Sequence, residues 1–205
     1  VRHAMRSATS ALLDTDLALA ESVIEHDSDI DDLAHAVEEG TFQLLAQQQP
    51  VAQDLRFLLA SLHNAATLAR MGDLATHIAK TTRMRYPMEV VPKELRGLVV
   101  DMGAVASRMI ANTAVALTRR DTSAARSLRD MDREMDRLYR ELFIIVLSPA
   151  WEYGVQAAVD ITLLGRYYER FADHAVTIGD RLVHVATGIQ DPPVPRQVNG
   201  PVNPR

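Results

Sequence analysis

Apolar residues recur along this chain every three or four positions, the spacing of a helix that buries one of its faces. If each residue turns the chain by about 100°, the apolar residues between 123 and 147 fall within roughly 80° of one another. They are Leu128, Met131, Met135, Leu138 and Leu142. Between 153 and 187 a similar arc holds Leu164, Tyr168, Phe171, Ala175, Ile178 and Leu182. Both stretches are therefore predicted to be amphipathic helices with one buried face.

Prolines and capping residues indicate where the helices begin and end. Pro50 and Pro92 suit the first turn of a helix, where the missing N–H has no partner to lose. Asp121 can cap the helix that begins after it, and Gly188 suits the left-handed position that follows a helix. The predicted helices cover 3–13, 16–47, 51–84, 93–119, 123–147 and 153–187. The fold class is therefore predicted to be all-α.

The composition narrows the class of protein. Of the 205 residues 47% are hydrophobic and none is cysteine, which excludes disulfide frameworks and thiolate zinc sites. No apolar run approaches the ~18 residues of a membrane span, and the longest strong run is Phe143–Leu147. No hydrophobic signal core follows the first residues, so a soluble cytoplasmic protein is expected. Residues 191–205 are rich in Pro, Asn and Gly and are expected to be disordered.

One short segment occurs twice. Residues 69–78 and 169–178 share Arg, Asp, Ala and Ile in register, and each copy is preceded by an Asp-x-x-x-Asp pair on the helix before it. A repeat of this length predicts two copies of a three-helix unit, a tandem of two three-helix bundles. The expected domains are 1–88 and 89–190, followed by the tail.

The two copies differ at their leading helix. The helix predicted at 3–13 is shorter by several turns than its counterpart at 93–119. Two interpretations are open: the start is truncated, or an apolar groove is left open for a partner.

Acidic residues on the predicted helices form pairs four residues apart. The pairs are Asp27/Asp31, Asp132/Asp136 and Glu169/Asp173, and Asp73 stands in the first copy where Asp173 stands in the second. Each like-charge pair costs a helix about 0.2–0.5 kcal/mol, a cost that a bound cation would offset. If neighbouring helices are antiparallel, these carboxylates converge into an oxygen-rich site for a hard cation such as magnesium, manganese, calcium or iron.

The same carboxylates also fit an ordinary solvated face, paired with arginines one turn away. His35 and His77 continue the acidic stripes at i+4, either as further ligands or as surface residues. No Glu-x-x-His motif occurs on a predicted helix, which disfavours ferritin-like di-iron chemistry.

A row of arginines lies along one face of the helix predicted at 123–147. It contains Arg126, Arg129, Arg133, Arg137 and Arg140. The row is either a surface for an anion or nucleic acid, or a solvated face with acidic partners such as Asp130 and Glu134. The net charge of −5 and the lack of interleaved aromatic residues favour the solvated face.

The sequence holds no Walker A loop, no Gly-x-Gly-x-x-Gly and no Gly-x-Ser-x-Gly. With no organised nucleophile either, the protein is predicted not to be an enzyme.

The repeated segments resemble the PhoU family of phosphate-transport regulators. The resemblance is carried by Gln49–Arg56, Ala69–Ala75 and Tyr168–Ala175, with Ala186–Gly188 at the close. It covers most of residues 5–188, and the charge balance and the tail resemble those of an actinobacterial member.

The resemblance implies a fold of two tandem three-helix bundles and a cytoplasmic accessory of the high-affinity phosphate ABC transporter. Members restrain the phosphate-starvation response through the transporter ATPase subunit and the sensor histidine kinase. These two proteins are the expected partners, and a homodimer is the expected assembly. Neither nucleic-acid binding nor membrane insertion is expected.

The resemblance also implies a metal. Some members carry iron or zinc clusters on Glu/Asp-x-x-x-Asp motifs, and Glu169 with Asp173 matches that motif. In the first copy Ala69 stands where the family usually has glutamate, which leaves Asp73 alone and weakens or abolishes the first site. Iron or zinc is thus expected before magnesium or manganese, with the pairs at 27/31 and 132/136 as companion ligands.

Three functions follow from these observations. The first is a helical signalling adaptor in phosphate regulation. The second is a protein whose carboxylate-bound metal is its primary function. The third is a DNA-binding repressor that uses the arginine row.

Overall fold

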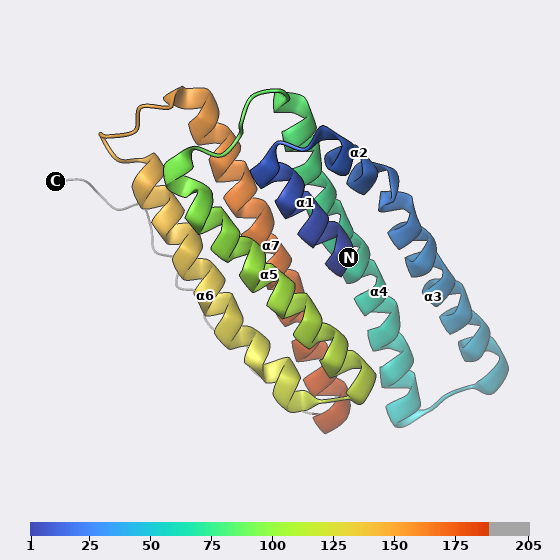
Figure 1. The fold of residues 1–205 in the computed structure, drawn as a ribbon. Helices are drawn as coiled ribbons and strands as arrows, with labels where there is room; N and C mark the ends of the chain where they lie inside the picture. Colours follow the sequence, from blue (N-terminus) through green and yellow to red (C-terminus); the bar gives the residue numbers. More distant parts are fainter. Residues whose placement is uncertain (189–205) are drawn as a thin grey trace.

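The structure, a computed structural model, describes residues 1–188, which fold into long α-helices joined by short connections (Figure 1). Within this range there is no β-strand, which confirms the all-α prediction. The helices are α1 (Arg2–Asp14), α2 (Leu17–Glu25), α3 (Asp27–Gln48), α4 (Ala52–Arg85), α5 (Lys93–Arg119), α6 (Thr122–Val146) and α7 (Gly154–Thr187). The disorder expected for 191–205 lies outside the described residues.

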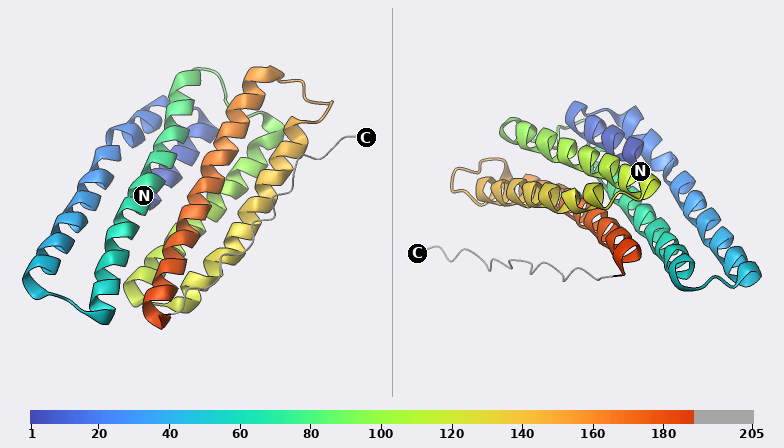
Figure 2. Two further views of the ribbon diagram at one scale, coloured as in Figure 1. Left: turned by 180° about the vertical axis from the view of Figure 1, so that it is seen from behind. Right: turned by 90° about the horizontal axis from the view of Figure 1, so that it is seen from below.

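The helices form two three-helix bundles in tandem, as the repeat predicts. Helices α5, α6 and α7 pack on one another as the second bundle (Figure 2). In the first bundle α4 packs with α1 and with α2 and α3, which follow each other directly and together take the place of one helix. The bundles are joined where α4 lies against α7 and α1 lies against α5. The domain boundary predicted between 88 and 89 stays a prediction, and it falls in the connection between α4 and α5.

The buried stripes that the sequence predicts on α6 and α7 supply much of the core. Tyr168 and Phe171 on α7 and Leu128 and Leu142 on α6 are fully or almost fully buried. They belong to one apolar cluster that also contains Met71 of α4, so both bundles share a continuous core. Burial of each such large side chain contributes about 1.5–3 kcal/mol to folding.

Two predicted helix ends have the expected caps. The Asp121 carboxylate accepts hydrogen bonds from the backbone N–H groups of Ser123 and Ala124, which fixes the start of α6. Gly188 follows α7 in the left-handed conformation, with φ of 70°.

The helix predicted over 16–47 is wrong in one respect, because it is broken at His26 into α2 and α3. The ring Nδ1 of His26 lies 2.7 Å from the carbonyl oxygen of Ser22, so the side chain sits over the end of α2. The residues that follow are acidic, with Asp27 and Asp29 in the first turn of α3. Carboxylates are stabilised at a helix N-terminus by the helix dipole, which favours a new helix start over a continuous helix.

The leading helix of the first bundle is short, as predicted: α1 has 13 residues and α5, its counterpart, has 27. Figure 1 shows α1 beside the half of α4 that leads to α5, whereas the α3–α4 connection extends beyond it. Apolar side chains on α3 and the first half of α4 are accordingly exposed. They include Leu33, Val37, Phe42, Leu44, Leu55, Phe57 and Leu59.

Among the helices of residues 1–188, one satisfies the length and composition of a membrane span, although the sequence contains no continuous apolar run of that length. This is α5, and half of its most apolar stretch is buried within the bundles. Residues such as Leu95, Met102 and Met109 pack in the shared core. A core helix of a bundle has the same composition, so the burial explains the apolar character of α5.

Candidate functional site

The two copies of the repeated segment face each other across the contact between α4 and α7. His77 of α4 stacks on Tyr167 of α7 with ring centroids 5.3 Å apart. Earlier on α4, Thr67 accepts a hydrogen bond of 2.7 Å from Arg181, which lies later on α7. Positions that rise along α4 therefore meet positions that fall along α7, and the helices are antiparallel. The contact between α4 and α7 therefore brings residues 69–78 and 169–178, which are far apart in the sequence, next to each other (Figure 2).

The first carboxylate cluster joins α3 to α4. Burial raises the pKa of Asp73, and the charges of Asp27 and Asp31 raise it further. A glycine permits this close approach, because a Cβ on Gly72 would lie 2.9 Å from the Cδ1 atom of Ile30. The structure therefore brings together three of the predicted residues, Asp27, Asp31 and Asp73.

The second cluster joins α6 to α7. Burial raises the pKa of Glu169 most. The charges of Asp173 on the same helix and of Asp136 on α6 raise it further. Arg166 opposes this rise through an ion pair with Glu169. Asp132, the remaining predicted residue, lies one turn before Asp136 on α6. The duplicated sequence thus builds an acidic cluster of similar composition in each bundle.

The donors in both clusters suit a hard cation chemically, since all are carboxylate oxygens. As placed, they do not converge: among residues 1–188 no group of three or more Asp, Glu or His side chains surrounds a point that a metal ion could occupy. Metal coordination by the seven predicted carboxylates therefore stays a prediction, and it requires side chains to turn toward a common centre.

The two candidate histidines have different surroundings. His35 is 78% exposed and lies 3.6 Å from Glu38 on its own helix, which fits a surface residue. His77 stacks on Tyr167 between the bundles, while its charge also lowers the pKa of Asp73.

The structure also contains a basic strip that the sequence analysis missed. Arg70 of α4 and Arg170, His174 and Arg181 of α7 lie along the α4–α7 contact, and we call these four residues the basic seam. Burial lowers the pKa of His174 and the positive charges of Arg170, Arg70 and Arg181 lower it further, while the negative charge of Asp173 raises it. Burial and the charge of Arg70 likewise lower the pKa of Arg181.

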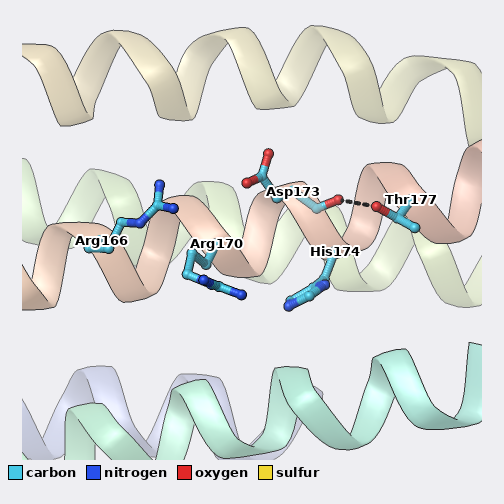
Figure 3. A pocket seen from close by; sticks show the side chains of 5 residues that line it. All are labelled: Arg166, Arg170, Asp173, His174 and Thr177. Atoms are coloured by element: carbon cyan, nitrogen blue, oxygen red, sulfur yellow. Dashed lines mark hydrogen bonds between the residues drawn. The ribbon is translucent and has the colours of Figure 1, made fainter. Parts of the chain in front are cut away.

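A cavity of about 190 Å³ opens onto the basic seam. It is lined by Arg166, Arg170, Asp173, His174 and Thr177 (Figure 3). Figure 3 shows Arg170 and His174 on the side of α7 that faces α4, whereas the Asp173 carboxylate points to the other side, toward α6. The sequence contained one indication of the basic seam, since Arg70 and Arg170 are the matching arginines of the two copies.

The arginine row on α6 is largely engaged with acidic groups. Arg129 pairs with Asp180 of α7 at 2.9 Å, and Arg133 pairs with Asp130 on its own helix. Arg137 lies 3.9 Å from Glu141, and Arg140 donates to a backbone carbonyl. These contacts favour the interpretation of a solvated, ion-paired face over a nucleic-acid surface.

The antiparallel packing and the duplicated motif define a class: tandem helical-bundle proteins with one acidic cluster in each bundle. The chain belongs to the PhoU domain family, which matches residues 1–82 and 99–182. This membership confirms the resemblance seen in the sequence.

Relatives and solved structures agree with this assignment. The chain is 45% identical to the phosphate-specific transport system accessory protein PhoU homolog 1 of Mycobacterium leprae, over 90% of the chain and 83% of the relative. It is 44% identical to homolog 2 of Mycobacterium tuberculosis, over 90% and 87%. These relatives support the expectation of an actinobacterial member.

Two crystal structures have the same fold. The phosphate transport system regulatory protein PhoU from Streptococcus pneumoniae is similar with a TM-score of 0.83 and 27% identity, covering 93% of this chain and 89% of that one. PhoU from Pseudomonas aeruginosa is similar with a TM-score of 0.80 and 26% identity, covering 92% and 90%.

Proposed function

We propose that this chain is a regulator of phosphate uptake that restrains the phosphate-starvation response when phosphate is plentiful. The observation that carries the proposal is its identity of 42–45% to mycobacterial proteins described as accessories of the phosphate-specific transport system. That similarity extends over about nine-tenths of the chain. The proposed role is therefore that of the whole protein and not of one shared module.

We propose further that it acts without catalysis, as a cytoplasmic adaptor between the ATPase subunit of the phosphate ABC transporter and the sensor histidine kinase, and that it works as a homodimer. The absence of a nucleotide-binding or nucleophile motif from the sequence supports an adaptor. So does the firm joining of the bundles, because a scaffold must hold its contact surfaces in fixed relation. Arg85 of α4 and Asp160 of α7 form a largely buried ion pair across that junction.

Gene deletion tests the regulatory role. Cells without the gene, grown at high phosphate, should transcribe the phosphate-uptake genes and take up labelled phosphate as starved cells do. Reintroduction of the wild-type gene should restore repression. Unchanged uptake and unchanged transcription in the deletion strain would overturn the proposal.

Co-purification tests the adaptor role separately. The tagged chain, isolated after cross-linking from cells at high phosphate, should carry the transporter ATPase and the kinase with it. If deletion derepresses uptake but neither protein is recovered with the chain, the regulator stands and the adaptor role is wrong.

Metal binding is a second candidate function, favoured by one observation. Like-charged carboxylates are held together in both bundles, and the pKa of Asp73 and of Glu169 is raised by burial first and by the neighbouring carboxylates second. A cation, either iron or zinc before magnesium or manganese, would relieve this repulsion. Elemental analysis of the purified protein should then find metal that is lost in the variant Glu169→Ala/Asp173→Ala and kept in Glu39→Ala, a control on an exposed position of α3. Equal metal content in all three proteins would reject this function.

A further inference from the structure

The basic seam gathers positive charge in a protein that is acidic overall. The chain carries a net charge of −5, yet the charges of Arg70, Arg170 and Arg181 all lower the pKa of His174, and the charge of Asp173 opposes them. Guanidinium groups repel one another, so such a gathering costs free energy unless anions lie among them. The question is therefore whether carboxylates of the protein neutralise these arginines.

Two of the three arginines have no acidic partner in the described part of the chain. Within residues 1–188 neither Arg70 nor Arg170 forms an ion pair, and both side chains are exposed. Arg181 donates instead to neutral oxygens of α4, the hydroxyl of Thr67 at 2.7 Å and the carbonyl of His63 at 3.2 Å. By contrast, the arginines at 85, 108, 129 and 166 each pair with a carboxylate.

The antiparallel packing explains why these charges meet. Arg70 and Arg170 occupy the same position in the two copies of the repeated segment. Because α4 and α7 are antiparallel neighbours, the two copies lie side by side along the α4–α7 contact and run in opposite directions. The carboxylates of the same copies, Asp73 and Asp173, interact with α3 and α6 instead. Each copy thus directs its carboxylate toward a helix of its own bundle and its arginine toward the other bundle.

The adjoining cavity has the size and polarity for a small anion. Its volume is about 190 Å³, and its lining side chains are all polar or charged. The Thr177 hydroxyl donates its single proton to the backbone carbonyl of Asp173 at 2.9 Å, and Arg166 is engaged by Glu169. Arg170 and the imidazole of His174 remain as donors on the side that faces α4 (Figure 3).

We propose that the basic seam is a binding site for a phosphate group, with Arg170 and His174 as donors from the lining of the cavity and Arg70 of the facing helix α4 as the donor from the other bundle. Guanidinium groups present parallel N–H donors that match the oxygens of a tetrahedral oxyanion. The phosphate group can be free inorganic phosphate or the terminal phosphate of a nucleotide. The site borders the second acidic cluster, because Asp173 also lines the cavity while its carboxylate points toward α6. It does not depend on the proposed regulatory function, because it is tested on the isolated protein.

Calorimetric titration of the purified chain at about 150 mM salt tests the site, since that salt concentration screens loose surface attraction. Inorganic phosphate or ADP should bind with a dissociation constant below about 1 mM. Tighter binding of ADP by more than about tenfold identifies a nucleotide as the source, and similar affinities identify free phosphate. The absence of binding of either anion up to about 10 mM would overturn the proposal.

A pair of matched variants ties the binding to the basic seam. Arg70→Gln/Arg170→Gln should weaken the affinity at least about tenfold. Arg83→Gln/Arg126→Gln removes the same charge from exposed positions elsewhere and should leave the affinity within about twofold. Equal losses in the two variants would show a response to net charge only and would refute the site.

Nuclear magnetic resonance of the unmodified protein provides a second measurement that does not depend on how the variants fold. Phosphate should shift the signals of the Arg70 and Arg170 side chains and of the amides around His174 and Thr177. Shifts confined to other regions would overturn the assignment.

Discussion

Arg85 in the last turn of α4 and Asp160 in the second turn of α7 form a doubly hydrogen-bonded ion pair. The Arg85 Nε atom lies 2.7 Å from Asp160 Oδ2, and its Nη2 atom lies 2.9 Å from Oδ1. Asp160 is only 6% exposed, and it also accepts a hydrogen bond from Gln156. The pair therefore fastens the end of the first bundle to the start of the last helix of the second.

Replacing Asp160 with Asn should loosen this junction. The change leaves the Arg85 guanidinium beside a buried neutral group, and a charge that loses its partner is destabilising. The thermal midpoint of unfolding should fall by several degrees. Asp14→Asn is the control, because Asp14 is 70% exposed and lies 3.9 Å from Arg96, so its removal should change the midpoint little. Equal midpoints for Asp160→Asn and wild type would contradict the role of the pair.

Helix packing in the second bundle depends on Gly179 of α7. A Cβ at this position would lie 2.9 Å from the backbone oxygen of Ala125 and 2.9 Å from Leu128 Cδ1. The backbone of α6 cannot move aside as a flexible side chain can, so Gly179→Ala should lower the free energy of unfolding by about 1–3 kcal/mol. Urea denaturation measures the change.

Gly97 on α5 provides the matched control for Gly179. It is exposed, and a Cβ there would meet nothing within 4 Å. Gly97→Ala should therefore raise the free energy of unfolding by about 0.5–1 kcal/mol, the ordinary helix preference of alanine over glycine. If both alanine variants change stability in the same direction, the close α6–α7 contact is not what requires glycine at 179.

The buried faces of α6 and α7 could be predicted from the sequence. The contacts between helices could not, because periodicity describes one helix at a time. The spacing of Leu128, Met135 and Leu142 reports which face of one helix is apolar, and those residues are buried. The caps at Asp121 and Gly188 are also local in sequence, and they too were predicted.

The break at His26 and the basic seam were missed for different physical reasons. The apolar pattern continues across His26, so periodicity alone predicts one continuous helix. It does not show that the acidic residues after His26 favour the start of a new helix. The meeting of Arg70 with His174 depends on which helices become neighbours and in which direction they run. A repeat shows that two residues are equivalent, but only tertiary packing decides whether they meet.

Tyr168 should make the protein sensitive to alkali. Its ring is fully buried, its hydroxyl lies 2.8 Å from Thr9 Oγ1, and burial raises its pKa above the ordinary range. Above about pH 10 the unfolded chain loses the tyrosine proton while the folded chain keeps it, so stability falls as the pH rises, by at most about 1.4 kcal/mol per unit.

Urea denaturation at about pH 8 and about pH 11 measures this loss. Tyr168→Phe removes the ionisable group. It should lower stability at the lower pH by about 1 kcal/mol through loss of the hydrogen bond to Thr9, and it should lose less than wild type between the two pH values. An identical pH dependence in both proteins would argue against a buried, protonated Tyr168.

The acidic cluster between α6 and α7 should destabilise the metal-free protein near neutral pH. The pKa of Glu169 is raised by burial and by Asp173 and Asp136. As the pH rises from about 4.5, the unfolded chain releases the Glu169 proton before the folded chain does. Stability therefore falls through this interval, and the loss is complete once the pH exceeds the raised pKa.

Glu169→Gln should remove that penalty. The gain at pH ~7 should be below about 1 kcal/mol, because the ion pair of Glu169 with Arg166 offsets part of the repulsion. It should vanish below about pH 4, where both states of the wild-type chain are protonated. Glu141→Gln, on an exposed position that faces Arg137 at 3.9 Å, should give no gain. A loss of stability in Glu169→Gln would mean that the ion pair with Arg166 outweighs the repulsion. If the proposed metal binding is correct, adding the cation should reverse the order and make the wild type the more stable protein, because the variant lacks one of the proposed ligands.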